Sequence, residues 1–160
     1  MFFTLAYNTG NTYLCSVNKI TIQAKNHFLV HNQEHLLAWL SDCVLRLNKE
    51  IGDIHIALMG DDDLLILNQK HLNHDEYTDV ITFDYSSSKA VNCDIAISTD
   101  RVSENATHEG VSIENELARV LIHGVLHCVG YSDKTVTNKR AMRQKEDEML
   151  KLFHVEQKLL

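Results

Sequence analysis

The sequence contains no proline, no pair of cysteines in a C-x-x-C arrangement and no long apolar run. Its four cysteines, Cys15, Cys43, Cys93 and Cys128, are widely spaced, which indicates neither a disulfide framework nor a cysteine zinc site. The simplest interpretation is reduced thiols in a cytoplasmic protein. No apolar stretch approaches the roughly 20 residues of a membrane-spanning helix, and the N-terminal MFFTLAY lacks the basic region of a signal peptide. We therefore expect no membrane association, whereas the absence of proline has no functional consequence that we identify.

Repeats, linkers and low-complexity segments are also missing. The 160 residues are 44% hydrophobic and 23% charged, so residues 1–160 are predicted to form a single domain with a substantial core. The net charge of −7 argues against a general nucleic-acid coat, because such proteins are basic. An acidic protein can still act on RNA through a metal ion and a local basic patch.

The most informative stretch runs from Leu117 to Asp133 and reads LARVLIHGVLHCVGYSD. His123 and His127 are four residues apart, so on a helix their Cβ atoms lie about 5–6 Å apart on one face. Gly130 can adopt a positive φ just past the helix end, where the chain can turn back. That turn would bring Asp133 beside the two imidazoles.

This H-x-x-x-H-x-x-G-x-x-D pattern predicts a metal site with His123, His127 and Asp133 as ligands and a fourth position open to water. Three protein ligands and one open position are typical of catalytic zinc. The helix is apolar on nearly all sides, so we expect it to be buried. The competing interpretation is two core histidines bonded to backbone carbonyls, because buried imidazoles need partners. Cys128 points about 100° away from His127 around the helix and is assigned to packing.

Zinc peptidases read H-E-x-x-H, with the glutamate as general base, whereas the second position here is Gly124. Without that base, no catalytic group is identified beyond a metal-bound water, which can supply a nucleophile near neutral pH. RNA suits such a site because it brings a charged phosphate and an internal nucleophile, the 2′-hydroxyl. Gly124 has two candidate roles, which are close approach of the substrate and close helix–helix packing.

Apolar periodicity predicts the elements around this motif. We expect strands over 53–59, 79–85 and 91–98, and one or two more within residues 1–30 through Leu14, Val17, Ile20 and Ile22. We expect helices over 33–48, 62–71, 99–110, 112–128 and 136–153. Strand 53–59, the short helix and strand 79–85 predict a right-handed crossover and a parallel pair. Strand 91–98 is predicted to be antiparallel to its predecessor.

Three further features concern these elements. Asn32 and Ser112 are candidate N-caps. Trp39 lies off the apolar stripe of its helix, where it either packs or is exposed. The acidic run from Asp61 to Asp63 is either a helix N-cap with favourable charges or a second metal site, and the cap explains it more simply.

Residues from about Ile51 to Phe153 resemble the YbeY family of metal-dependent, single-strand-specific endoribonucleases, also called rRNA maturation factors. The resembling pieces are TDVITFDY (78–85), CDIAIS (93–98), ENELARVLIHGVLHCVGYSD (114–133) and EDEML (146–150). The family pattern H-G-x-L-H-x-x-G-Y, followed by a third ligand, is matched from His123 to Tyr131. The first 30 residues carry little of the resemblance.

The resemblance implies an α+β fold, in which helices flank a small mixed β-sheet and a central, zincin-like helix carries both histidines. It implies a cytoplasmic bacterial protein that matures the 3′ end of small-subunit ribosomal RNA and takes part in ribosome quality control. The implied cofactor is one divalent metal ion, zinc first, with manganese, nickel, iron or magnesium open. The implied partners are single-stranded ribosomal RNA, small ribosomal subunit proteins and an assembly GTPase, and the chain is expected to be a monomer.

Two positions depart from the family. Asp133 stands where many members have histidine, and a carboxylate should lower the Lewis acidity of the ion and broaden the choice of metal. Leu72 stands where many members carry an arginine thought to serve the RNA phosphate, and His74, Lys70 or a distant basic residue is a candidate replacement. Two other functions stay open, which are a ribosome-assembly binding protein with a structural metal and a hydrolase of another substrate.

Overall fold

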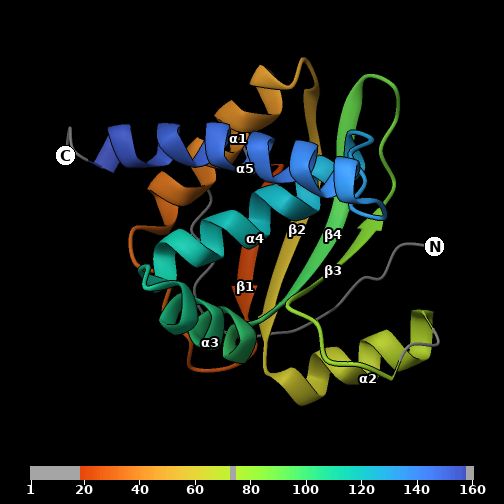
Figure 1. Ribbon diagram of the computed structural model, residues 1–160, viewed down its shortest axis with the longest axis vertical. Helices are drawn as coiled ribbons and strands as arrows, with labels where there is room; N and C mark the ends of the chain where they lie inside the picture. The colour runs from red at the N-terminus through yellow and green to blue at the C-terminus, as the bar shows by residue number, and fades with distance from the viewer. Residues whose placement is uncertain (1–18, 73–74, 158–160) are drawn as a thin grey trace.

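The computed structural model describes residues 19–72 and 75–157, which form a four-stranded sheet with helices packed around it (Figure 1). The strands are β1 (Ile20–Ala24), β2 (Glu50–Met59), β3 (Val80–Asp84) and β4 (Ala90–Ser98). The helices are α1 (Gln33–Arg46), α2 (Asp61–Leu72), α3 (Thr99–Glu109), α4 (Ile113–Cys128) and α5 (Val136–Gln157). The predicted α+β class is therefore confirmed, and the predicted strand positions Leu14 and Val17 lie outside the described residues.

The strand order is β1-β2-β4-β3, with β1, β2 and β4 parallel and β3 antiparallel to β4. The antiparallel prediction for strands 79–85 and 91–98 is confirmed. The predicted parallel pair of strands 53–59 and 79–85 is wrong, because β2 and β3 are not neighbours and run in opposite directions. Helix α2 turns the chain at the carboxyl end of β2, β3 runs back from there, and β4 then takes the place between them.

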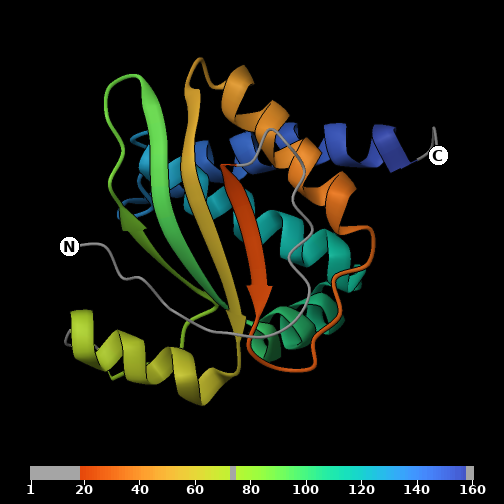
Figure 2. The same ribbon diagram turned by 180° about the vertical axis from the view of Figure 1, so that it is seen from behind.

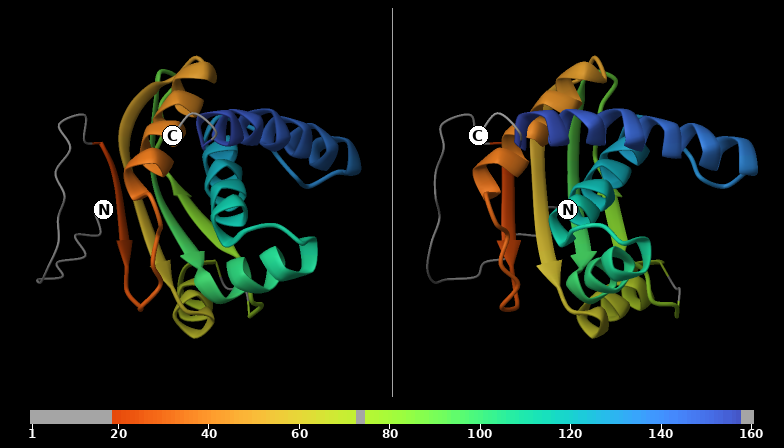
Figure 3. Two further views of the ribbon diagram at one scale, coloured as in Figure 1. Left: turned by 90° about the vertical axis from the view of Figure 1, so that its left-hand side faces the viewer. Right: turned by 60° about the vertical axis from the view of Figure 1, so that its left-hand side comes forward.

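The helices are unequally divided between the faces of the sheet: α1, α3, α4 and α5 lie on one side, and α2 packs at one end of the other (Figures 2 and 3). Successive strand residues point to opposite faces. On β4, Ile95 and Ile97 accordingly join the large core under α1, α4 and α5. Ala96 joins a small cluster with Leu64 of α2 and Ile81 of β3.

Helix α4 is the central helix, since it contacts α1, α3, α5, β3 and β4. Its apolar side chains Leu117, Val120, Leu121, Ile122, Val125 and Leu126 are all buried. Burial on this scale fixes the helix rigidly, at roughly 1.5–3 kcal/mol for each large apolar side chain. The prediction of a buried helix is thereby confirmed, and the two histidines on it stand on a rigid support.

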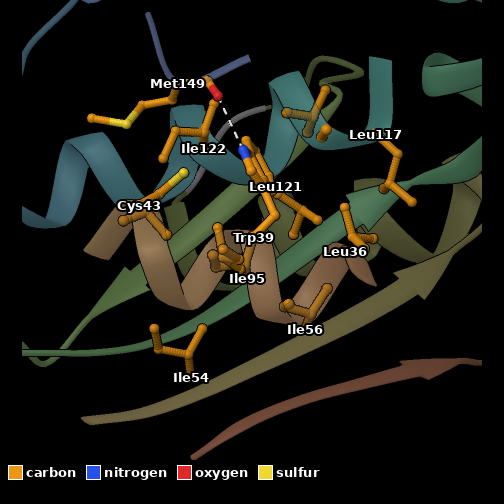
Figure 4. Close-up of a cluster of buried hydrophobic side chains, with 14 of the residues drawn as sticks. Leu36, Trp39, Cys43, Ile54, Ile56, Ile95, Leu117, Leu121, Ile122 and Met149 are labelled. Carbon is orange, nitrogen blue, oxygen red and sulfur yellow. Dashed lines mark hydrogen bonds between the residues drawn. The ribbon is translucent and has the colours of Figure 1, made fainter. Parts of the chain in front are cut away.

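Trp39 is fully buried and joins α1 to α5 (Figure 4). Its indole Nε1 donates a hydrogen bond of 3.0 Å to the main-chain carbonyl of Met149. The indole ring also packs against Phe153, with ring centroids 5.1 Å apart. Of the two interpretations for this residue, packing is the one that holds.

The predicted caps differ in how they work. The Ser112 side chain accepts a hydrogen bond of 3.1 Å from the Asn115 amide, as expected of an N-cap. Asn32 occupies the N-cap position of α1 with φ of 50°, but its side chain makes no capping bond.

Two helices end at other residues than predicted. Helix α1 ends two residues earlier, at Arg46 rather than Asn48, and α5 continues to Gln157, four residues beyond Phe153.

Gly52 lies inside β2. A Cβ at this position would meet the carbonyl oxygen of Val91 at 2.4 Å, so only glycine permits the approach of β4. The pairing of β2 with β4 shifts register here, between Ile51 and Ile54.

Throughout the described part of the chain, no helix has both the length and the apolar character that crossing a bilayer requires.

Candidate metal centre

His123 and His127 lie one turn apart near the C-terminal end of α4 and face the same side. Their rings are nearly perpendicular, with centroids 4.6 Å apart and an interplanar angle of 88°. The His123 side chain is 21% exposed and the His127 side chain 34% exposed. Both imidazoles are therefore anchored in the protein yet open to solvent on one side.

The turn after α4 brings the third candidate ligand to this side. Gly130 has φ of 98°, as predicted, and the Tyr131 amide donates a 3.0 Å hydrogen bond to the Leu126 carbonyl. The chain thus reverses within a few residues, and Asp133 Oδ2 lies 4.0 Å from His127 Nε2. One ligand atom from each of His123, His127 and Asp133 lies within 4.8 Å of the others.

The hydrogen bonds behind the imidazoles determine which nitrogen faces the site. His127 Nδ1 is 3.1 Å from the Tyr131 carbonyl oxygen, and His123 Nδ1 is 2.7 Å from Glu146 Oε1. A carbonyl or carboxylate oxygen accepts, so each Nδ1 must carry the hydrogen. In the neutral rings, both Nε2 atoms then present a lone pair toward the space beside Asp133.

The donor set fits a divalent metal ion. The two Nε2 atoms are 3.0 Å apart, and two lone pairs at this distance repel unless a proton or a cation lies between them. Two nitrogens bound at about 2.0–2.1 Å to one tetrahedral zinc ion would be about 3.3 Å apart. Asp133 is 45% exposed and its Oδ2 lies 4.0 Å from His127 Nε2, so a small movement of this side chain would complete a three-ligand set.

Behind the site lies a network of charged side chains that sequence reasoning did not identify. Arg119 Nε donates a 2.8 Å hydrogen bond to buried Glu116, and Arg119 Nη2 is 3.5 Å from Asp79 Oδ2. Hydrogen bonding to Glu116 raises the pKa of the Arg119 guanidinium, the charges of Glu116, Glu146 and Asp79 act in the same direction, and burial opposes them. Arg119 is therefore a permanent cation one helical turn from His123.

Glu146 is the second member of the site that sequence reasoning did not identify. The segment EDEML contributed to the family resemblance, but its glutamate received no role. A signal was available, because Glu146 interrupts the apolar stripe of Met142, Met149, Leu150 and Phe153 on α5. A carboxylate on the buried face of a helix needs a specific partner.

Gly124 allows close packing of α4 on the sheet, which neither predicted role describes. A Cβ at this position would lie 2.8 Å from Thr82 Oγ1 and 3.4 Å from Ile95 Cδ1. The residue is buried against β3 and β4, so it does not open the site to a substrate. Close packing at Gly124 was predicted, but against another helix, whereas the observed partner is the sheet.

Among the residues that the structure describes, none of the remaining candidates forms a hydrogen bond or ion pair with this centre. Asp61 accepts hydrogen bonds from Ser98 Oγ and Arg101 Nε, which uses its carboxylate within the fold rather than for a metal. Leu72 is the last residue of α2 and is 46% exposed. Lys70 belongs to the last turn of α2, and His74 lies outside the described residues.

An open hollow of about 420 Å³ adjoins the network between the end of α3, the start of α4 and α5. Its lining is Glu109, Val111, Asn115, Glu116, Arg119, Arg143, Asp147, Leu150, Lys151 and His154. The lining contains both basic and acidic side chains, and its two arginines already form ion pairs, Arg119 with Glu116 and Arg143 with Glu146. The hollow therefore does not by itself identify a phosphate site.

The sequence and the fold of this chain are both similar to those of known proteins. The family model described as Endoribonuclease YbeY matches residues 15–154. A protein of that name from Flavobacterium psychrophilum is 48% identical over 130 residues, which cover 81% of this chain and 93% of that protein. One from Christiangramia forsetii is 41% identical, with coverage of 87% and 97%. A Thermotoga maritima protein solved in solution matches with a TM-score of 0.60 and 27% identity over 87% of this chain and 91% of that one.

Proposed function

The chain belongs to the YbeY family of endoribonucleases, and from this premise we propose that it cleaves single-stranded RNA with a divalent metal ion held by His123, His127 and Asp133. The observation that carries the proposal is the meeting of two Nε2 atoms and one carboxylate on a solvent-open side of α4. When bound, such an ion would make a water ligand acidic and stabilise the negative charge that develops on the phosphate.

The protein's own contribution is to hold these donors in place. The Tyr131 carbonyl and the Glu146 carboxylate keep a hydrogen on each Nδ1, so that both Nε2 atoms are available as donors. The rigid helix α4 supplies both rings, while the turn at Gly130 supplies the carboxylate. The exposed side of the rings leaves room for the substrate phosphate.

We propose zinc as the natural ion. Two imidazole nitrogens and one carboxylate oxygen are a donor set that zinc accepts, with one position left open. Compared with a third histidine, Asp133 is a harder donor and adds one negative charge, which favours manganese, iron or magnesium more than three imidazoles would. Nickel is a further candidate, because imidazole also suits that ion.

The proposed substrate is RNA rather than a peptide. Gly124 occupies the position at which zinc peptidases carry their glutamate base, and its close packing on Thr82 leaves no room for a larger side chain. RNA supplies its own nucleophile through the 2′-hydroxyl and thus needs less from the protein. The family further supports ribosomal RNA as the target, with 3′-end maturation of the small-subunit RNA and ribosome quality control as the cellular roles.

The proposed partners are small ribosomal subunit proteins and an assembly GTPase. We propose that the chain binds them in the cytoplasm as a monomer. Depletion of the protein in its own host would then cause precursor small-subunit RNA with an unprocessed 3′ end to accumulate. Normal processing in its absence would contradict this cellular role while leaving the activity on RNA open.

The activity itself is tested with a labelled single-stranded RNA, the purified full chain and added zinc or manganese. We expect cleavage by the wild type and a loss of at least about a hundredfold for His127→Ala, because metal-assisted catalysis contributes several kcal/mol. His108→Ala is the matched control, since this histidine is 82% exposed and lies beside Glu109 at the end of α3. No cleavage by the wild type with any divalent ion would favour the binding-protein alternative.

A further inference from the structure

Glu146 is a carboxylate in an apolar environment. It lies on the face of α5 that packs on α4, between Met142 and Met149, and it is only 3% exposed. Burial of an ionised carboxylate costs several kcal/mol unless charged and hydrogen-bonding partners compensate it. The partners of Glu146 therefore explain why a glutamate is tolerated here.

Both carboxylate oxygens of Glu146 have such partners. Oε1 lies 2.7 Å from His123 Nδ1. Oε2 lies 3.4 Å from an Arg143 guanidinium nitrogen and 3.8 Å from one of Arg119. The shortest of these contacts is the one to the candidate metal ligand, and the two arginines compensate the charge from the other side.

This arrangement controls the orientation of His123. A carboxylate accepts a hydrogen bond, so Nδ1 of the ring carries the hydrogen and Nε2 is left with its lone pair. The same contact fixes the rotation of the ring, because Nδ1 must face α5 for the bond to form. His127 achieves this result with the Tyr131 carbonyl, whereas His123 depends on a side chain from another helix.

We propose that Glu146 is a positioning residue, which holds His123 in the tautomer and ring orientation needed to bind a metal ion through Nε2, with Arg119 and Arg143 holding Glu146. Histidine ligands commonly donate their second N–H to a carboxylate, and loss of that partner typically costs 10–100-fold in metal affinity. The proposal rests on the proposed function only in taking His123 as a ligand. Its alternative is a purely structural role, in which Glu146 joins α4 to α5 as the counter-ion of Arg119.

The experiment compares zinc affinity, measured by competition with a chromophoric chelator, between the wild-type full chain, Glu146→Gln and Glu146→Met. Glutamine keeps the shape and an acceptor oxygen, so we expect Glu146→Gln to lower zinc affinity by about threefold to tenfold. Methionine removes the acceptor, so we expect Glu146→Met to lower zinc affinity by about 10–100-fold. The matched control is Glu148→Gln, which makes the same change on the same helix at a side chain that is 58% exposed and paired with Lys145. We expect the control to bind zinc within about twofold of the wild type, because exposed pairs contribute little.

Two further measurements separate positioning from structure. Nitrogen-15 NMR of the zinc-free protein reports whether Nδ1 of His123 carries a hydrogen, which it should do in the wild type and only in part of the molecules in Glu146→Met. Melting in the presence of a chelator reports stability without metal. A structural role alone would lower the melting temperature of Glu146→Met and leave both the tautomer and the zinc affinity of the folded protein unchanged, and that result would overturn the proposal.

His123→Ala, measured in parallel, separates this proposal from the metal site itself. If His123→Ala keeps wild-type zinc affinity, the ligand assignment fails and the positioning role fails with it. If His123→Ala loses zinc while both Glu146 variants bind it like the wild type, the metal site stands and only the role of Glu146 is overturned. Should Glu146→Met not fold, Glu146→Gln and the NMR measurement decide the question.

Discussion

Nε2 of His127 lies 3.0 Å from Nε2 of His123, and the hydrogen bonds behind the two rings direct both atoms toward Asp133. From this relationship we expect one equivalent of metal per chain. His123→Ala should reduce the bound metal to well below half an equivalent after dialysis against micromolar chelator, since two ligands remain. His108→Ala should keep the full equivalent. Elemental analysis of freshly purified protein makes the measurement, and a full equivalent in His123→Ala would contradict the assignment.

Replacement of Asp133 by histidine should change which metal the site prefers. An imidazole is neutral and softer than a carboxylate oxygen, so Asp133→His should favour zinc over manganese more strongly than the wild type does. We expect the ratio of the zinc and manganese dissociation constants to shift by about tenfold, or roughly 1.4 kcal/mol. Competition titrations with both ions measure this ratio. An unchanged ratio would show that Asp133 does not contact the ion.

The packing of Gly124 on β3 gives a test that does not depend on metal. Gly124→Ala places a methyl group 2.8 Å from Thr82 Oγ1, so we expect a loss of about 1–3 kcal/mol in the free energy of unfolding. Thr82→Ala removes the obstructing atom, and the double variant should therefore be more stable than the sum of the single changes indicates. Urea unfolding of the four proteins completes the cycle. Strict additivity would mean that Gly124 does not meet Thr82.

The candidate site was largely predictable from sequence because its ligands are local. His123, His127, Gly130 and Asp133 lie within eleven consecutive residues, where helix geometry and one positive-φ turn determine their relative positions. Glu146 could not be predicted as a partner of His123, since their contact depends on how α5 crosses α4. Periodicity predicts that each helix has a buried face but does not pair one face with another.

The sheet shows the same division between local and non-local information. Strands and helices were predicted near their observed positions, but the order of the strands was not. The crossover rule applies when the chain returns parallel to the first strand, and nothing in residues 60–79 reveals that α2 instead reverses the chain. Gly52 is a second example, because its role is the close approach to Val91 on a strand that is remote in sequence.

Trp39 provides a test of the contact between α1 and α5. Trp39→Phe keeps an aromatic ring beside Phe153 but removes the hydrogen bond to the Met149 carbonyl and part of the buried volume. We expect a loss of about 2 kcal/mol, which corresponds to a fall in melting temperature of about 4–8 °C for a chain of this size. Leu45→Ala is the control, because Leu45 is 54% exposed on the same helix and should change stability by less than about 0.5 kcal/mol. Equal melting temperatures for both variants would contradict the structural role of the indole.

The last prediction concerns the chemistry on RNA. If the 2′-hydroxyl is the nucleophile, an RNA with a single 2′-deoxy substitution at the cleaved position should be cut at least about a hundredfold more slowly there, because proximity of an internal nucleophile is worth several kcal/mol. Equal cleavage of the substituted RNA and of the same RNA without the substitution would rule out that mechanism and leave external water as the attacking group. The net charge of −7 means that RNA must be held by a few local cations, so binding should be modest and should weaken with salt in proportion to the few phosphates contacted. Leu72→Arg should raise RNA affinity if the end of α2 lies along the bound strand, whereas Leu45→Arg adds the same charge on α1 and is the control. An equal gain from both variants would mean that charge alone, and not the position of residue 72, improves binding.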